Sequence, residues 1–140
     1  MITENEIQIA RETLRLSLEK GAEKARVNLY KSEEDMVVTL NGAIDRVTHC
    51  SDSSISFSLF VDGRYGSFST NELDIDSLGD FITKAISITK MIAKDPCRDL
   101  PDPSRCCKDA VTGNELELLD PFYKEITPEM RSKTALGAAI

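Results

Sequence analysis

The chain has 140 residues, of which 41% are hydrophobic and 29% are charged, as is usual for one globular domain with its own core. Its 17 basic and 24 acidic residues give a net charge of −7. This charge argues against direct nucleic-acid binding, because proteins that hold a phosphate backbone usually carry the opposite sign. No apolar run approaches the ~20 residues of a membrane helix, and the acidic, amphipathic beginning of the chain lacks the pattern of a secretory signal or a transit peptide. These features predict a cytoplasmic protein without a membrane partner.

The first predicted element is a helix over residues 3–20. Thr3 and Glu6 have the spacing of a capping box, in which each side chain bonds the main-chain N–H of the other residue. Gly21 follows, as is usual where a helix ends in a left-handed residue. An apolar stripe is expected from four residues at helical spacing: Ile7, Ala10, Leu14 and Leu18.

Alternating apolar and polar residues predict an antiparallel sheet of four to five strands. Asn41-Gly42 and Asp62-Gly63 tolerate the positive φ angles of tight hairpin turns, so each is expected to join two strands. Residues 33–35, which are acidic, and residues 51–53, which are polar, are expected to form two further turns. Since every connection is short, we expect a meander. The predicted strands are residues 24–31, 36–40, 44–48, 54–61 and 64–69.

A second amphipathic helix is predicted over about residues 75–94, ending before Pro96. Since both helices and the sheet each have one apolar face, we expect an α+β domain over residues 1–95. In it, two helices pack on one face of the sheet in the order helix, strands, helix. Residues 96–140 are expected to form a proline-rich, extended C-terminal connector and the start of a helix near residue 128. That helix runs to the end of the sequence without a cap, which suggests a fragment of a longer protein. The apolar side of the second helix is expected to contain Leu78, Phe81, Ile82, Ala85, Thr89 and Ile92.

A metal site would have to include His49, the only histidine in the sequence. Cys50 and Asp52 are the nearest other ligands. A catalytic metal needs about three protein ligands, and no HxH, CxxC or HExxH spacing occurs. We therefore expect an exposed histidine at a strand end and no metal site.

The cysteines offer a second candidate site. Cys97, Cys106 and Cys107 lie in one predicted loop, but their spacing fits no common zinc site. Without a secretory signal, reduced thiols are expected. A nucleophilic Cys50 or Cys97 paired with His49 would need the loop to fold back onto the sheet, and no motif supports this pairing.

Gly63-Arg64-Tyr65-Gly66 might suggest a phosphate-binding loop, but such a loop should open a helix, and here strands are predicted on both sides. Turn and close-packing roles are expected for these glycines. Residues 33–35 are expected to be a solvated turn, and Phe81 and Met91 to belong to the helix stripe. The sequence therefore predicts no catalytic, cofactor-binding or metal residue.

Several short motifs follow one another in a specific order along residues 5–105. The strongest is the block from Val61 to Leu73, VDGRYGSFSTNEL. The others are Gly21-Ala22-Glu23 with Ala25 and Val27, Asn41-Gly42 with Ile44 and Val47, the helix with Ala85 and Ile92, Asp95-Pro96, and Leu100-Pro101-Asp102-Pro103. In this order they resemble the N-terminal region of the TldD/PmbA family, also labelled modulators of DNA gyrase. The resemblance thins out toward residues 127–129.

The resemblance implies a subunit of a zinc-dependent peptidase much longer than this chain. In the family two related subunits pair, and one carries an HExxxH helix and a cysteine that bind zinc, with the glutamate as general base. The pair degrades small or unfolded peptides in a closed chamber. Because His49 is the only histidine, HExxxH does not occur here. Zinc is therefore implied only for a catalytic region downstream of residue 140.

The first hypothesis is an N-terminal, non-catalytic domain of such a subunit, inactive alone, which forms part of the chamber wall and contacts a related subunit in a homo- or heterodimer. Its exposed strand edges could receive peptide by β-addition, as the serine-rich outer face of residues 54–58 suggests. The alternative is a stand-alone module that regulates a partner protein such as DNA gyrase, where negative charge would suit a basic partner surface. An enzyme that uses Cys50 or Cys97 is a third hypothesis. The reading frame after Ile140 distinguishes the first two.

Overall fold

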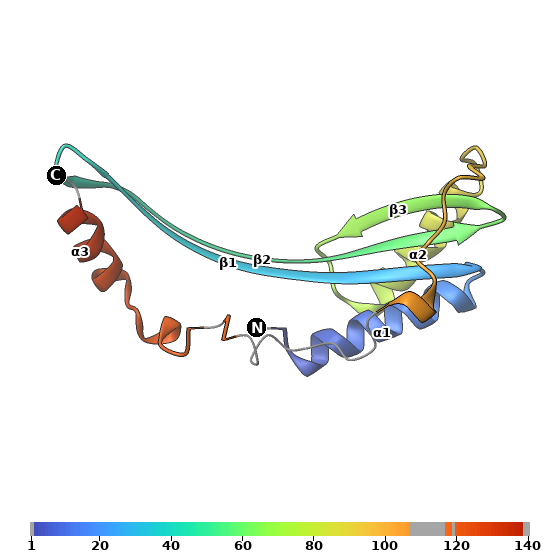
Figure 1. Cartoon of the computed structure of the whole chain (residues 1–140), viewed down its shortest axis with the longest axis horizontal. Helices are drawn as coiled ribbons and strands as arrows, with labels where there is room; N and C mark the ends of the chain where they lie inside the picture. The colour runs from blue at the N-terminus through green and yellow to red at the C-terminus, as the bar shows by residue number, and fades with distance from the viewer. Residues whose placement is uncertain (1, 107–116, 119, 139–140) are drawn as a thin grey trace. The chain divides into compact units, whose positions relative to one another are not determined.

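The computed structural model of the chain describes residues 2–106, 117, 118 and 120–138. In these residues the helices are α1 (Glu4–Glu19), α2 (Ile75–Thr89) and α3 (Pro128–Ala138), with short 3-10 turns η1 (Pro103–Arg105) and η3 (Tyr123–Glu125). The strands are β1 (Lys24–Leu40), β2 (Ala43–Val61) and β3 (Arg64–Thr70), in the spatial order β1-β2-β3 (Figure 1). None of these helices is both long and apolar enough to cross a membrane.

The α+β class and the antiparallel sheet are confirmed, but the sheet has three strands in the described residues, not four or five. The expected turns at residues 33–35 and 51–53 do not form, because β1 and β2 continue through them. Neither segment contains glycine or proline, the residues that most often interrupt a strand. The chain does turn at Asn41-Gly42, with φ of 51° and 77°, and at Asp62-Gly63, with φ of 51° and 70°. The described residues also hold three α-helices rather than two, and α3 begins where the sequence predicts the start of a helix.

The chain divides into two compact units. Unit 1 comprises Met1–Ser32 and Ser51–Pro103, and unit 2 comprises Glu33–Cys50 and Ser104–Ile140. β1 and β2 therefore each contribute residues to both units.

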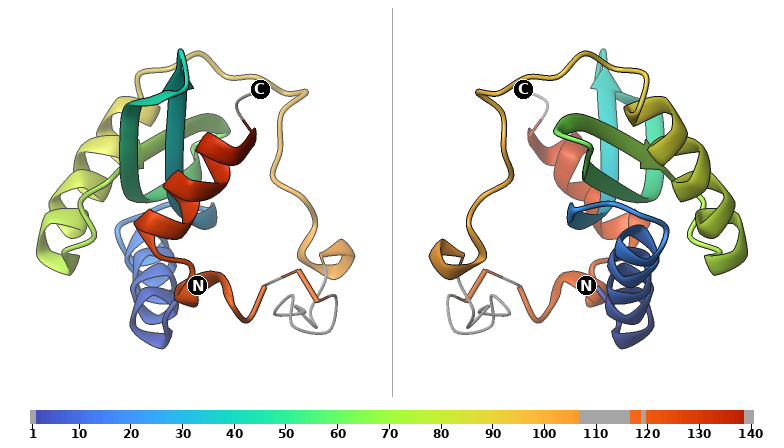
Figure 2. Two further views of the ribbon diagram at one scale, coloured as in Figure 1. Left: turned by 90° about the vertical axis from the view of Figure 1, so that its left-hand side faces the viewer. Right: turned by 90° about the vertical axis from the view of Figure 1, so that its right-hand side faces the viewer.

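The core of unit 1 lies between one face of the sheet and the helices α1 and α2, which lie side by side (Figure 2). Phe57, Leu59 and Val61 alternate along β2 and are fully buried, as a period of two requires for one inward face. Ile82 and Ala85 of α2 pack against them. Each large apolar side chain buried in this way contributes about 1.5–3 kcal/mol to folding. Partly buried residues that complete the core are Leu16, Ala25, Val27, Phe68 and Phe81.

Helix α1 begins with the predicted capping box, since the Glu6 N–H donates to Thr3 Oγ1 at 3.3 Å and the Thr3 N–H donates to Glu6 Oε2 at 2.6 Å. The carboxylate of Glu6 also accepts from Lys31 Nζ of β1 at 2.9 Å. These bonds lower the pKa of Glu6 from 4.5 to about 2, and the hydrogen bond from the Thr3 main chain makes the largest contribution. Glu6 thus stabilises the start of the helix and connects it to the sheet.

The apolar stripe expected on α1 does not face the core. Thr13 and Ser17 are fully buried, whereas Ile7, Leu14 and Leu18 are 37–46% exposed. The buried hydroxyls are satisfied within the helix, because each donates to the carbonyl oxygen four residues earlier, at 2.8 Å for Thr13 and 2.7 Å for Ser17. Small side chains allow α1 to pack closely, so the shape of the face decides its orientation here rather than its hydrophobicity.

Helix α2 packs against β3 at Gly66. A Cβ atom at this position would collide with Thr89 Oγ1 and would lie 2.7 Å from Cε2 of Phe68. Thr89 is fully buried, and its hydroxyl donates to the Ala85 carbonyl oxygen at 2.8 Å. The close-packing role predicted for a glycine of the Gly63–Gly66 segment is therefore confirmed at Gly66.

Unit 2 is held together by the carboxylate of Asp35 in β1. It accepts hydrogen bonds from His49 Nδ1 of β2 at 2.8 Å and Tyr123 Oη of η3 at 3.1 Å, and it forms an ion pair with Arg131 Nη2 of α3 at 3.0 Å. The Arg131 guanidinium also lies 5.4 Å from the centre of the Tyr123 ring. The hydrogen bond from His49, followed by the contributions of Tyr123 and Arg131, lowers the pKa of Asp35. The hydrogen bond that Tyr123 donates to the Asp35 carboxylate raises the pKa of Tyr123. One carboxylate thus joins four separate segments of unit 2.

Replacing Gly66 with alanine should destabilise the protein by about 1–3 kcal/mol, because the added methyl group overpacks the contact between α2 and β3. The matched control is Gly79→Ala in α2, where the new Cβ would have no neighbour within 4 Å apart from the adjoining backbone of its own helix. That change should stabilise by up to about 1 kcal/mol, since alanine favours a helix over glycine. Urea unfolding of both variants gives the two values, and equal effects would contradict this account.

Replacing Asp35 with alanine should speed amide hydrogen exchange in residues 123–138 and leave exchange in α2 unchanged, because the shared acceptor is lost only in unit 2. Asp45→Ala is the matched control, since Asp45 is exposed and no described contact involves its carboxylate. Because the folded pKa of Asp35 is lowered, its contribution is complete above about pH 4 and is lost as the pH falls through the lowered pKa. Exchange that is independent of both the mutation and acid would show that Asp35 does not hold α3.

Candidate functional site

The histidine considered as a metal ligand lies on β2 and is bonded to a carboxylate. His49 is exposed, and its Nδ1 is 2.8 Å from Asp35 Oδ1. Cys50 is the next residue of the same strand, so the two side chains point to opposite faces of the sheet. In residues 2–106, 117, 118 and 120–138, no three His, Cys, Asp or Glu side chains are placed to hold a metal ion. These residues do not fit a zinc centre, and no metal-dependent step is derived from them.

The cysteines of the predicted loop are exposed where the structure describes them. Cys97 is a free thiol whose main-chain N–H donates to Asp95 Oδ1 at 3.0 Å, and Cys106 is also exposed. Cys107 lies outside the described residues, so the arrangement of the three loop cysteines stays untested. Cys50 is a free, exposed thiol, and its neighbour His49 bonds a carboxylate.

The segment Gly63–Gly66 forms a hairpin turn and the beginning of β3, as predicted, so a strand and not a helix follows the turn directly. The guanidinium of Arg64 donates to the main-chain oxygens of Ile92 at 2.9 Å and Asp62 at 3.2 Å. Two of its donors are thus used within unit 1, and the segment does not form a phosphate-binding loop. Met91 lies beyond the end of α2 and is 86% exposed, so its predicted place in the helix stripe is wrong. Phe81 does belong to that stripe, with its ring 5.6 Å from that of Phe57.

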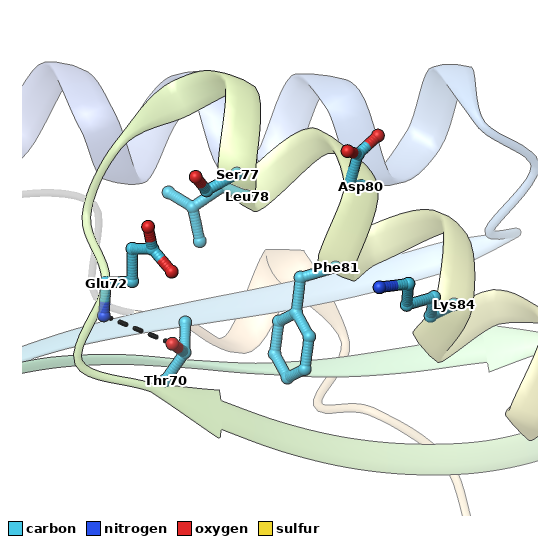
Figure 3. Close-up of a pocket in the computed structure, with 7 residues that line it drawn as sticks. All are labelled: Thr70, Glu72, Ser77, Leu78, Asp80, Phe81 and Lys84. Atoms are coloured by element: carbon cyan, nitrogen blue, oxygen red, sulfur yellow. Dashed lines mark hydrogen bonds between the residues drawn. The ribbon is translucent and has the colours of Figure 1, made fainter.

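A pocket of about 280 Å³ lies between the end of β3 and helix α2 (Figure 3). Its apolar part is formed by Leu78, which is 1% exposed, and by Phe81, whose ring projects from α2 toward β3. Exposed charged side chains border it, namely Glu72, Asp80 and Lys84. Thr70 and Ser77 complete the lining, and Thr70 Oγ1 accepts from the Glu72 N–H at 3.1 Å. No sequence motif singles out these charged residues.

Strand β3 is an edge strand, because only β2 pairs with it in the described sheet. In the two-residue hairpin, Val61 and Arg64 form the first hydrogen-bonded pair, and pairing with β2 then recurs at every second residue. In agreement, the oxygen of Phe60 points the other way and accepts from the Glu23 N–H at 2.8 Å. The main-chain groups of Tyr65, Ser67 and Ser69 therefore point away from β2, along the open edge. The pocket lies beside the end of this edge, so edge and pocket form one surface, which we call the β3–α2 groove.

The outer face of the sheet near the hairpin is covered by the segment that follows α2. The Arg98 guanidinium lies 4.4 Å from the centre of the Tyr65 ring, and Lys24 Nζ binds Asp99 Oδ2 at 2.6 Å. Tyr65 Oη is 3.0 Å from Ser58 Oγ, and this bond lowers the pKa of Tyr65. Ser67 and Ser69 remain exposed, so the part of the β3 edge next to the pocket is open to solvent.

The solved structures that are similar to this chain include the following two. The first, from Bacteroides thetaiotaomicron, is of a proposed modulator of DNA gyrase. It is 35% identical to this chain and has a TM-score of 0.86. The match covers 98% of this chain and 30% of the other chain. The second, TldE from Thermococcus kodakarensis, is 16% identical, with a TM-score of 0.62 over 81% of this chain and 26% of its own, and it shows the fold alone. The chain thus spans less than a third of either protein.

A comparison with curated protein sequences found no match. A comparison with family models matched residues 25–89 to PmbA/TldA metallopeptidase domain 1. The matched region includes most of β1, all of β2 and β3, and α2, which together form the β3–α2 groove and most of the core of unit 1. The resemblance found in the sequence is confirmed, because residues 25–89 match the model of the first domain of the PmbA/TldA metallopeptidases.

Proposed function

We propose that this chain is the N-terminal, non-catalytic domain of a TldD/PmbA-type zinc metallopeptidase subunit that acts on small or unfolded peptides in the cytoplasm. The match of residues 25–89 to the first domain of this metallopeptidase family carries the proposal. The similar Bacteroides thetaiotaomicron chain is more than three times as long as the part that this chain covers, which leaves room for a separate catalytic region. Zinc and the groups that activate water would belong to that region.

The domain would form part of the chamber wall and contact a related subunit. Helix α1 offers a surface for this contact, because Ile7, Leu14 and Leu18 lie on one side of the helix and are exposed. Neighbouring exposed apolar side chains of this kind often mark a protein–protein interface. We refer to these three residues as the α1 row.

A second candidate function is regulation of a partner protein by a stand-alone module. The similar structure from Bacteroides thetaiotaomicron supports it, since that protein is named as a proposed modulator of DNA gyrase. The net charge of −7 would favour a basic partner surface. Binding of the purified chain to gyrase, at a site that the α1 row does not affect, would favour this alternative.

The purified chain should contain less than stoichiometric zinc and should not cleave unfolded peptides, because the described residues provide no metal-binding group. Metal analysis by mass spectrometry and a cleavage assay with an unfolded, labelled peptide test both expectations. Stoichiometric zinc together with cleavage by this chain alone would overturn the proposed non-catalytic role. Finding an HExxxH motif in the reading frame downstream of Ile140 would support it.

Replacing Leu18 with aspartate should weaken association with a metal-bearing subunit of the family at least about tenfold, because a charge would have to be buried in the contact. Gln8→Asp is the matched control, since Gln8 is exposed on another side of α1 and should leave association unchanged. Analytical ultracentrifugation of the co-expressed chains measures the effect. Equal association of both variants would remove the α1 row from the subunit contact.

A further inference from the structure

We propose that the β3–α2 groove binds an extended peptide, which pairs its main chain with the edge of β3 and places a lysine or arginine side chain in the pocket. This inference specifies a peptide-binding surface for the proposed function and rests on it for its biological role. The binding itself follows from the edge, the pocket and the charges, and it can be tested with this chain alone.

The edge of β3 provides the main-chain complementarity. Outward N–H and C=O groups at Tyr65, Ser67 and Ser69 alternate with residues that pair with β2. An extended backbone is the partner that matches donors and acceptors at this spacing, as in other sheets that bind peptides by strand addition. The serine side chains of positions 67 and 69 are small and exposed, so they leave space for an incoming strand.

The position of the pocket sets the residue of the peptide that enters it. Thr70 and Phe68 point to the inner face of the sheet, the face that α2 covers, and Thr70 lines the pocket. In an added strand, one side chain in two points to this same face. The side chain beside Thr70 would therefore enter the pocket, while its immediate neighbours in the peptide would point to the serine-rich outer face.

The charges and the apolar floor of the pocket favour a long basic side chain. Two carboxylates, Glu72 and Asp80, and one ammonium group, Lys84, border it, and within the described residues the structure shows no ion pair for any of them. In Figure 3 the Glu72 carboxylate points into the pocket from the side opposite Lys84. The stem of a lysine or arginine would cover Phe81 and Leu78, and its charged end would reach the carboxylates.

A second copy of this chain is a poorer occupant of the edge than a basic peptide. Each copy carries a net charge of −7, and pairing two β3 edges would bring the acidic residues of two grooves together. The basic residue of β3 itself, Arg64, already donates to two main-chain oxygens of unit 1. Charge complementarity therefore selects a basic extended segment.

The main-chain part of the proposal is tested with a fluorescein-labelled peptide that carries one lysine, valine at the other inward positions and threonine at the outward positions. Fluorescence anisotropy with the full 140-residue chain should show saturable binding. The same peptide methylated on its backbone nitrogens along one edge should bind roughly tenfold or more weakly, because it cannot donate to β3. This comparison leaves the protein unchanged, so a folding defect cannot explain its result. Equal binding of both peptides would overturn strand addition.

The pocket part is tested with the double variant Glu72→Gln/Asp80→Asn, which keeps the size of both side chains. Binding of the lysine peptide should fall roughly five- to tenfold and lose much of its salt dependence. Asp52→Asn is the matched control, since Asp52 is an exposed carboxylate of β2 that does not line the pocket, and it should change binding little. A peptide with glutamate in place of lysine should bind the unchanged protein more weakly. The same loss in variant and control, or no preference for lysine, would overturn the assigned pocket.

Two further measurements separate the alternatives. Without peptide, ultracentrifugation should show no dimer that forms through the β3 edge. A dimer that the substitution Ser67→Pro abolishes would mean that a second copy of the chain, and not a peptide, occupies the edge. Failure of every peptide to bind, with association through the α1 row intact, would overturn this inference and leave the proposed subunit role standing. Conversely, peptide binding without any association to a related subunit would support the groove and count against that role.

Discussion

The close approach of α2 to β3 at Gly66 is the constraint on which unit 1 depends. The absent side chain of Gly66 leaves room for Thr89, whose buried hydroxyl is satisfied by its own helix. The helix can therefore lie against the strand without leaving a polar group unpaired, and Phe81 reaches the rings of Phe57 and Phe68. The same arrangement sets Leu78 beside the end of β3. The core and the β3–α2 groove are thus two results of one packing contact.

Local signals in the sequence predicted those parts of the fold that depend on local geometry. Positive φ at Asn41-Gly42 and Asp62-Gly63 and the capping box at Thr3 were predicted because each involves only neighbouring residues. The turns expected at residues 33–35 and 51–53 were wrong because a polar run can equally continue a strand when a partner strand satisfies its main chain. Local composition does not contain that information.

Helix α1 and the candidate sites show the same limit at the level of packing. Hydrophobicity favoured the face with Leu14, whereas Thr13 and Ser17 are buried because small side chains allow close helix packing. The residues that contact the Asp35 carboxylate come from separate segments of the chain, so no motif spacing could reveal them; they are His49, Tyr123 and Arg131. In the sequence, the charged residues that border the pocket look like those of an ordinary solvent-exposed helix face. Only the structure shows that they lie beside an open strand edge.

The unbroken course of β1 and β2 through both compact units has a consequence for how related chains can vary. Because side chains alternate between the two faces of a strand, inserting one residue inverts the facing of every residue between the insertion and the next turn. Such a change in β2 would turn Phe57, Leu59 and Val61 toward solvent and bring serines inward. In related chains, insertions and deletions in β1 and β2 are therefore expected at the Asn41-Gly42 turn. Elsewhere in these strands they are expected to add or remove two residues at a time.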